Sequence, residues 1–106
     1  MTQRHGLDTE AVHAGSAPVE LHGAVAVAIY QTSTFAFDSV SQGAGRFAGT
    51  EDGYIYTRMG NPTVAALEEA IAQLERGAGA IATSSGMAAI VNVFFTYLEA
   101  GAHVVG

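Results

Sequence analysis

The chain has 106 residues, with ten acidic side chains, four basic ones that are all arginine, and no cysteine. A formal net charge of -6 argues against nucleic-acid binding, because an acidic surface repels phosphate backbones, and the absence of cysteine excludes disulfides and thiolate metal sites. Only 13% of the residues are charged, against about 25% in a typical soluble domain, so we expect a partner or further chain to cover apolar surface.

The first third of the chain predicts a short helix followed by a long extended arm. Asp8 and Thr9 are good caps for one or two helical turns over residues 10–14, and Gly15 provides the left-handed geometry common after a helix. From residue 17 to residue 37 the apolar side chains follow no helical period, and β-favouring residues accumulate towards the end. This arm has few large side chains of its own to bury. We therefore expect it to lie across another surface.

The clearest helix signal lies in the middle of the chain. Asn61 is a good N-cap, Pro62 fits the first turn and Gly77 fits the end. Apolar residues recur there at three- and four-residue spacing, so the helix has one apolar face. That face comprises Val64, Leu67, Ile71 and Leu74. Upstream, the glycine-rich residues 38–53 predict only one helical turn, over residues 42–48.

The C-terminal part of the chain predicts a strand, a helix and a strand. Residues 80–83 and 104–105 are strand candidates, and residues 87–99 predict a helix that is apolar around most of its circumference. This order is the unit of an α/β parallel sheet with a right-handed crossover. We therefore interpret residues 61–106 as the start of a large α/β domain and residues 1–60 as an arm and inter-subunit segment.

No segment has the pattern of a secretion signal or a membrane span. The first ten residues are polar, unlike the basic start and apolar core of a signal peptide. The longest apolar run is interrupted by Asn92 and is much shorter than the ~20 residues that cross a bilayer. We therefore expect a cytoplasmic protein. The histidines lack metal-ligand spacing, so we predict no metal site; they are His5, His13, His22 and His103.

The turn at Ser84-Ser85-Gly86-Met87 is one candidate anion site. Where a strand leads into a buried helix, free backbone N–H groups and the positive end of the helix dipole favour a phosphate. Gly86 allows close approach of the backbone, and serine hydroxyls offer further donors. Neither the Walker pattern nor G-x-G-x-x-G is present, so the sequence does not indicate a nucleotide site. The alternative is that Ser85 is only an N-cap and Gly86 only eases the turn.

Tyr56 and Arg58 form a second candidate anion site. Arginine carries a planar, permanently charged fork that suits phosphate or carboxylate, and a tyrosine two residues away in an extended chain lies on the same side. The two side chains would then clamp an anion. The alternative is a surface arginine that stacks on a tyrosine beside the start of a helix.

Five short motifs follow one another along nearly the whole chain. They are T-x-x-V-H-A-G at residues 9–15, Y-Q-T-S-T-F at 30–35, Y-T-R-x-G-N-P-T at 56–63, a frame of two Leu-Glu pairs at 67–75, and S-S-G-M-A-A at 84–89. In this order they resemble the N-terminal portion of the Cys/Met-metabolism enzymes, the trans-sulfuration or γ-family that depends on pyridoxal phosphate. The run at residues 82–87 favours the methionine γ-lyases among them.

The resemblance implies a fold, a reaction and roles for residues. The fold is type I, like that of aspartate aminotransferase, and the reaction is a C–S lyase or γ-replacement reaction on a sulfur-containing amino acid. Ser85, Gly86 and Met87 match positions that bind the phosphate of pyridoxal 5'-phosphate. Tyr56 and Arg58 match positions that reach across a subunit interface to the phosphate in a neighbouring site, within a homotetramer.

The chain contains no lysine. Pyridoxal-phosphate enzymes attach their cofactor through a lysine amine, and the same group usually moves protons. We therefore expect the N-terminal fragment of an enzyme that contributes phosphate binding, with no catalytic residue of its own and no covalent attachment of the cofactor. Two alternatives stay open. One is a non-catalytic module that binds a phosphorylated ligand or a protein, and the other is a chain that does not fold stably alone.

Overall fold

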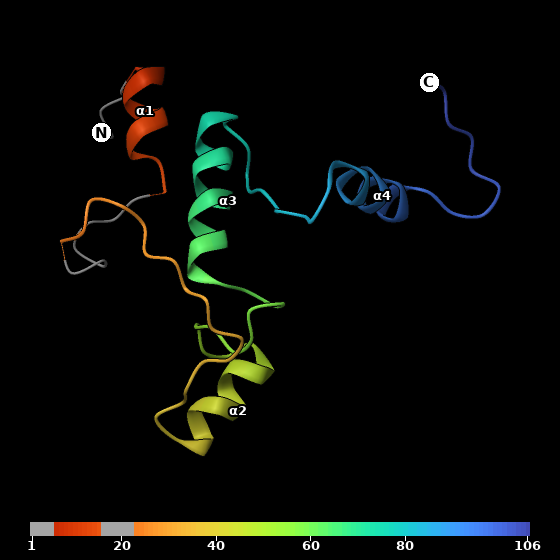
Figure 1. The fold of residues 1–106 in the computed structure, drawn as a ribbon. Coiled ribbons are helices and arrows are strands. Elements are labelled where there is room, and N and C mark those ends of the chain that lie inside the picture. The colour runs from red at the N-terminus through yellow and green to blue at the C-terminus, as the bar shows by residue number, and fades with distance from the viewer. Residues whose placement is uncertain (1–5, 16–22) are drawn as a thin grey trace.

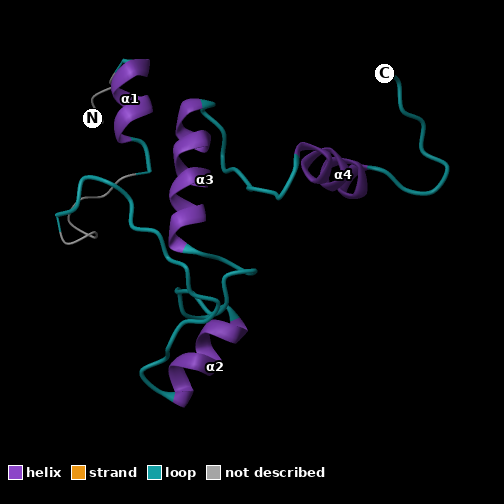
Figure 2. Cartoon of the chain, viewed as in Figure 1, coloured by secondary structure: helices purple, strands orange, loops and turns teal. Residues whose placement is uncertain are grey.

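The computed structural model describes residues 6–15 and 23–106, and helices are the only extended regular elements in these ranges (Figures 1 and 2). An isolated antiparallel bridge pairs Thr34 with Tyr56. The remaining described residues form loops and turns. The four helices are α1 (Leu7–His13), α2 (Val40–Ala48), α3 (Pro62–Leu74) and α4 (Gly86–Tyr97).

Helices α1 and α3 lie side by side, and no other pair of described helices is in contact (Figure 1). Gly15, just after α1, has a φ of 72°, which confirms the predicted left-handed end of this helix. A side chain at this position would overlap the carbonyl oxygen of Ala66 on α3, so the close packing of the two helices also requires glycine here. The predicted start was wrong: Gly6 is the N-cap, and Asp8 lies in the first turn.

Helix α2 is longer than the single turn that the sequence predicted. The Ser39 hydroxyl accepts a hydrogen bond from the Gln42 N–H (3.1 Å), and the Gln42 side chain accepts one from the Asp38 N–H (2.8 Å). This reciprocal arrangement resembles a capping box, which satisfies N–H groups at the start of a helix. Gly49 ends the helix with a φ of 69°. The two caps stabilise α2 although it contains two glycines.

Helix α3 begins as predicted and ends differently. The Asn61 side chain accepts a hydrogen bond from the Thr63 N–H (2.9 Å), which confirms the N-cap, and Pro62 occupies the first position. At the other end, Arg76 takes the left-handed conformation, with a φ of 54°, in place of Gly77. The Gly77 N–H then donates to the carbonyl of Ala72 (2.8 Å). A non-glycine residue in this conformation costs about 1–2 kcal/mol.

Only the helix of the predicted strand-helix-strand unit is present. It forms as α4 and ends at Tyr97, two residues earlier than expected. The two predicted strands, residues 80–83 and 104–105, do not form among the described residues, where both segments are irregular. A strand persists only when a neighbour accepts its backbone hydrogen bonds, and neither segment has one in the described part of the chain. The Ala82 N–H donates instead to the Glu68 carboxylate on α3 (2.8 Å).

The described residues form no hydrophobic core. The accessible surface is 8849 Å², whereas a compact monomer of this mass exposes about 5,600 Å². The radius of gyration is 17.4 Å, against about 13 Å for a compact domain of this length. Helix α4 projects away from the other three (Figure 1). Most of its large apolar side chains are exposed. No described helix is both long and apolar enough to cross a membrane.

Candidate functional site

The backbone of Tyr56 is fixed by pairing between the arm and the loop that precedes α3. The Phe35 N–H donates to the carbonyl of Ile55 (3.1 Å), and the Thr57 N–H donates to that of Ser33 (2.9 Å). These two hydrogen bonds lie on either side of Tyr56. Because directional bonds hold both neighbours, the position of the tyrosine is set by the arm as well as by the loop.

Arg58 lies in a turn that follows Tyr56. The N–H groups of Met59 and Gly60 both donate to the carbonyl of Tyr56, at 2.8 and 3.1 Å. The Arg58 guanidinium carbon lies 5.4 Å from the centre of the Tyr56 ring, within the range of a cation–π contact. The sequence predicted that the two side chains meet, but the reason it gave was wrong, because a turn brings them together and not an extended strand.

The Tyr56–Arg58 pair borders an open cavity of about 420 Å³ whose lining residues all carry polar groups, here called the polar cavity. Hydroxyl groups, an amide and the guanidinium line this cavity, and no carboxylate does. No described residue accepts a hydrogen bond from the Arg58 guanidinium, and Arg58 is exposed. An anion fits such a lining better than a cation. The lining residues are Tyr30, Gln31, Thr32, Ser33, Tyr56, Thr57 and Arg58.

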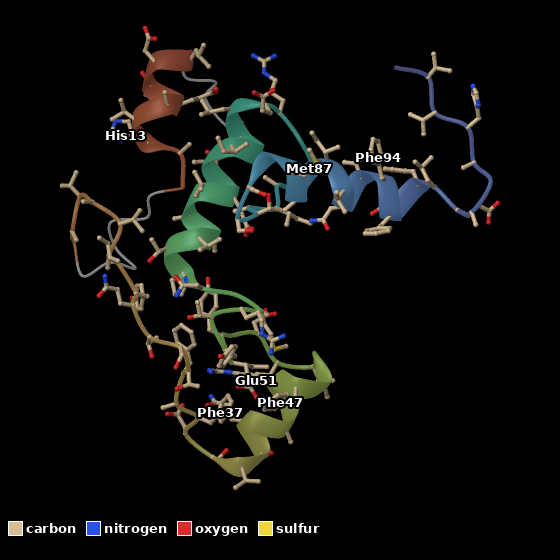
Figure 3. The ribbon with its side chains drawn as sticks, turned by 45° about the vertical axis from the view of Figure 1, so that its right-hand side comes forward. His13, Phe37, Phe47, Glu51, Met87 and Phe94 are labelled. Atoms are coloured by element: carbon tan, nitrogen blue, oxygen red, sulfur yellow. The ribbon has the colours of Figure 1, made fainter. Side chains whose placement is uncertain are left out.

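An apolar cavity of about 360 Å³ lies on another side of the same pair. Phe37 and Phe47 contribute to it and pack edge to face, with ring centres 6.2 Å apart (Figure 3). The Arg46 guanidinium carbon lies 5.6 Å from the centre of the Phe37 ring, and its NH1 group donates to the carbonyl of Tyr54 (3.1 Å). Arg46 therefore ties α2 to the loop that carries the Tyr56–Arg58 pair.

At the start of α4, Ser85 is the N-cap. Its hydroxyl accepts a hydrogen bond from the Ala88 N–H (3.1 Å), as the simpler of the two sequence interpretations required. The N–H groups of Gly86 and Met87 have no acceptor among the described residues. An added Cβ at Gly86 would meet nothing within 4 Å, so this side of the helix start is open. Two free N–H groups at the positive end of a helix suit a phosphate.

The structure does not bring the two candidate groups together. Ser85, Gly86 and Met87 line neither cavity at the Tyr56–Arg58 pair. Figure 3 shows Met87 at the start of α4, away from Phe37 and Phe47, and Figure 1 shows the same separation between α4 and the loop before α3. One copy of the chain thus carries the two candidate groups in two places. No described histidine lines the polar cavity, and His5 and His22 lie outside the described residues.

Comparison with known proteins shows the family to which the chain is related. The family model of the Cys/Met metabolism PLP-dependent enzymes matches residues 8–106. The chain belongs to this family.

Relatives within the Cys/Met metabolism family include both a lyase and a sulfhydrylase. The L-methionine gamma-lyase of Fusobacterium nucleatum subsp. polymorphum is 58% identical over 98% of this chain and 26% of its own length. The O-acetyl-L-homoserine sulfhydrylase of Corynebacterium glutamicum is 43% identical over 94% of this chain and 23% of its own length. The chain thus spans about a quarter of the length of the curated relatives that it matches.

Solved structures share the path of the chain. The O-acetylhomoserine (thiol)-lyase of Campylobacter jejuni superposes with a TM-score of 0.84 and 33% identity, over 92% of this chain and 24% of that one. That enzyme was solved with its cofactor as N'-pyridoxyl-lysine-5'-monophosphate. The present chain has no lysine, so none of its 106 residues matches that group in chemistry.

The residues of this member of the Cys/Met metabolism family fit one end of pyridoxal phosphate. The phosphate is an anion, and Gly86, Met87 and Arg58 offer N–H donors that no described residue occupies. The aldehyde end requires an amine, and no side chain of the sequence provides one. The sequence predicted these donors and the N-cap at Asn61. It did not predict the hydrogen bonds of Asn61 and Thr63 with the carbonyls of Tyr30 and Ala28 in the arm.

Proposed function

We propose that the chain forms the phosphate-binding part of a pyridoxal-phosphate-dependent enzyme that acts on a sulfur-containing amino acid. The reaction is a C–S lyase or γ-replacement reaction, and the identity to methionine γ-lyases favours γ-elimination. The observation that carries the proposal is the open start of α4, where Ser85 caps the helix and the Gly86 and Met87 N–H groups are free among the described residues. Membership of the family supports the choice of cofactor.

The proposal divides the phosphate-binding residues between two active sites. Ser85, Gly86 and Met87 hold the phosphate of one cofactor at the positive end of α4. Tyr56 and Arg58 reach the phosphate in the neighbouring copy of a homo-oligomer, a tetramer. Their separation within one copy supports this division, because a single phosphate cannot contact both groups.

We also propose a domain organisation and a cellular location for the chain. Residues 1–60 form the arm and inter-subunit segment, and residues 61–106 begin the large α/β domain of a fold-type-I enzyme in the cytoplasm. In that setting, strands from outside these residues complete the sheet, and segments 80–83 and 104–105 join it. The exposed apolar surface of α4 supports this arrangement, because further protein is needed to cover it.

When bound, the cofactor acts as an electron sink for bonds that break at the substrate. The residues of this chain hold and orient it. The Gly86 and Met87 N–H groups and the dipole of α4 fix the phosphate in one site. The Arg58 fork offsets the charge of the phosphate in the neighbouring site, and Tyr56 keeps that fork in place. The group that moves protons is outside this residue set, because the chain has no lysine.

The experiment titrates the isotope-labelled chain with pyridoxine 5'-phosphate, followed by nuclear magnetic resonance. This compound keeps the ring and the phosphate but lacks the aldehyde, so it does not react with the amino terminus. We expect the backbone amides of Gly86 and Met87 and the Arg58 side chain to shift. Pyridoxine, without the phosphate, is the matched control and should shift none of them. Equal shifts with both compounds, or none with either, would contradict the proposal.

A second candidate is a non-catalytic module that binds a phosphorylated ligand. The absence of lysine favours it, since the chain alone fits only the phosphate end of the cofactor. Calorimetry separates the two functions. If inorganic phosphate binds as tightly as pyridoxine 5'-phosphate, the ring contributes nothing and the module is the better description.

A further inference from the structure

Asn61 is the only buried polar or charged side chain in the described part of the chain, with 4% of its surface exposed. Its carbonyl oxygen accepts from the Thr63 N–H at 2.9 Å, which caps α3. Its amide nitrogen donates to the carbonyl of Tyr30 at 2.9 Å and to the hydroxyl of Thr57 at 3.1 Å. A cap needs only the acceptor. The two donor contacts therefore serve a different purpose.

Two threonines extend these contacts to the arm. The Thr57 hydroxyl donates to the carbonyl of Thr32. The Thr63 hydroxyl donates to the carbonyl of Ala28 (2.8 Å) and accepts from the Tyr30 N–H (2.9 Å). We call Asn61, Thr57 and Thr63 the polar clasp. It joins residues 28–32 of the arm to both ends of the segment that contains Arg58.

The polar clasp and the Tyr56–Arg58 pair share a short stretch of backbone. Arg58 lies one residue after Thr57 and three before Asn61, inside the turn that returns to the Tyr56 carbonyl. The Arg58 side chain itself makes no hydrogen bond to a described residue, so its position depends on the ends of that turn. Thr57 and Asn61 are bonded to each other and to the arm, which fixes both ends.

We propose that Asn61 is a positioning residue that holds Arg58 over the Tyr56 ring through its donor contacts with Thr57 and the arm. In this role it sets the affinity of the pair for a phosphate, a consequence that rests on the proposed function. A directional contact in a buried position suits this role, because the amide loses a donor bond if either partner moves. The hydrogen-bond role of Asn61 thus extends beyond the helix cap.

The diagnostic variant is Asn61→Asp. The carboxylate keeps the acceptor that caps α3, but it cannot donate to Tyr30 or Thr57 and repels the Tyr30 carbonyl. The readout is the upfield shift of the Arg58 side-chain protons that the Tyr56 ring causes. We expect this shift in the wild type and its loss in Asn61→Asp, with α3 intact. Asn92→Asp makes the same chemical change at an exposed site on α4 and should keep the shift.

If Asn61→Asp also unfolds α3, a second pair of variants tests whether the donor contacts of Asn61 position Arg58. Thr57→Val removes the hydroxyl that accepts from Asn61 and leaves the cap untouched, so it should abolish the Arg58 shift. Thr57→Ser retains the hydroxyl and should restore it. Survival of the shift in both Asn61→Asp and Thr57→Val would overturn the proposal. Free exchange of the Asn61 side-chain amide protons in the wild type would overturn it as well.

Binding of pyridoxine 5'-phosphate, followed at Arg58, measures the functional consequence. We expect Asn61→Asp to weaken binding at Arg58 about tenfold, the effect of roughly one lost charge-assisted hydrogen bond, and to leave the Gly86 amide response unchanged. If the wild type does not bind, the proposed function fails while the Arg58 proton shifts still test the positioning role. Equal binding by wild type and Asn61→Asp contradicts the positioning role and leaves the proposed function intact.

Discussion

The arm-loop region (residues 28–63) differs from the C-terminal region (residues 80–106) in the contacts that its polar and apolar groups make. In the arm-loop region, hydrogen bonds link backbone segments that are about 25–35 residues apart in sequence, and aromatic contacts reinforce them. In the C-terminal region, the hydrogen bonds are local apart from the one between the Ala82 N–H and Glu68 on α3, and the large apolar side chains of α4 face solvent.

The difference shows which part of the chain is held in place by its own contacts. Directional polar contacts give the arm-loop region a defined geometry without a hydrophobic core. The hydrophobic effect is not directional, and α4 gains nothing from it until another surface covers its side chains. The chain therefore contains a preformed Tyr56–Arg58 pair, whereas the phosphate-binding helix start stands on an uncovered element.

The largest expected effect compares the same substitution in the two regions. Phe35 is half-buried, and its ring centre lies 5.3 Å from that of Tyr54, so Phe35→Ala should destabilise the arm-loop region by about 2 kcal/mol. Phe95 is 83% exposed, so Phe95→Ala should change local stability by less than about 0.5 kcal/mol. Exchange of the Thr57 amide and of α4 amides measures both. Equal effects would remove the distinction between the regions.

A smaller effect is expected at the start of α4. Ser85→Ala removes the hydroxyl that accepts from Ala88 and should destabilise this helix by about 1 kcal/mol. The carbon chemical shifts of residues 86–90 report the loss. Ser84→Ala is the matched control, because the Ser84 hydroxyl makes no hydrogen bond to a described residue. A comparable loss of helix in both variants would argue against Ser85 as the cap.

The smallest effect concerns the contact between α3 and the C-terminal region. The Glu68 carboxylate on α3 accepts from the Ala82 N–H at 2.8 Å, and Glu68→Ala should release this contact at a cost of about 0.5 kcal/mol. Faster exchange of the Ala82 amide measures the release. In Glu69→Ala, which removes only a contact with Gln73 within the helix, the Ala82 amide should exchange as in the wild type. No change in Glu68→Ala would mean that the contact does not form in solution.

Local signals in the sequence predicted much of the helical structure. Asn61, Pro62 and Ser85 carry their information within three residues, so the cap and start of α3 were correct, Ser85 is the cap that one of the two interpretations required, and α4 begins one residue before the predicted start. The capping arrangement at Ser39 and Gln42 is equally local, and the spacing could have revealed the start of α2. Its glycines favoured the shorter prediction.

Other features depend on groups far apart in the sequence. The donors of Asn61 reach Tyr30, and the neighbour that a strand at residues 80–83 requires is absent from the described residues, so no local pattern reports either. The left-handed conformation fell on Arg76 although Gly77 was available, a difference that nothing in the structure explains. The candidate residues were found as two groups, while the polar clasp that holds one group became visible only in three dimensions.

Hydrogen exchange of the isolated chain, resolved by residue, tests the central comparison most directly. We predict protection of the Phe35 and Thr57 amides and the Asn61 side-chain amide, together with rapid exchange along α4, because contacts between distant segments hold the arm-loop region, whereas α4 packs against no other described helix. Protection of α4 equal to that of the arm-loop region, or rapid exchange at Phe35, Thr57 and Asn61, would contradict the account.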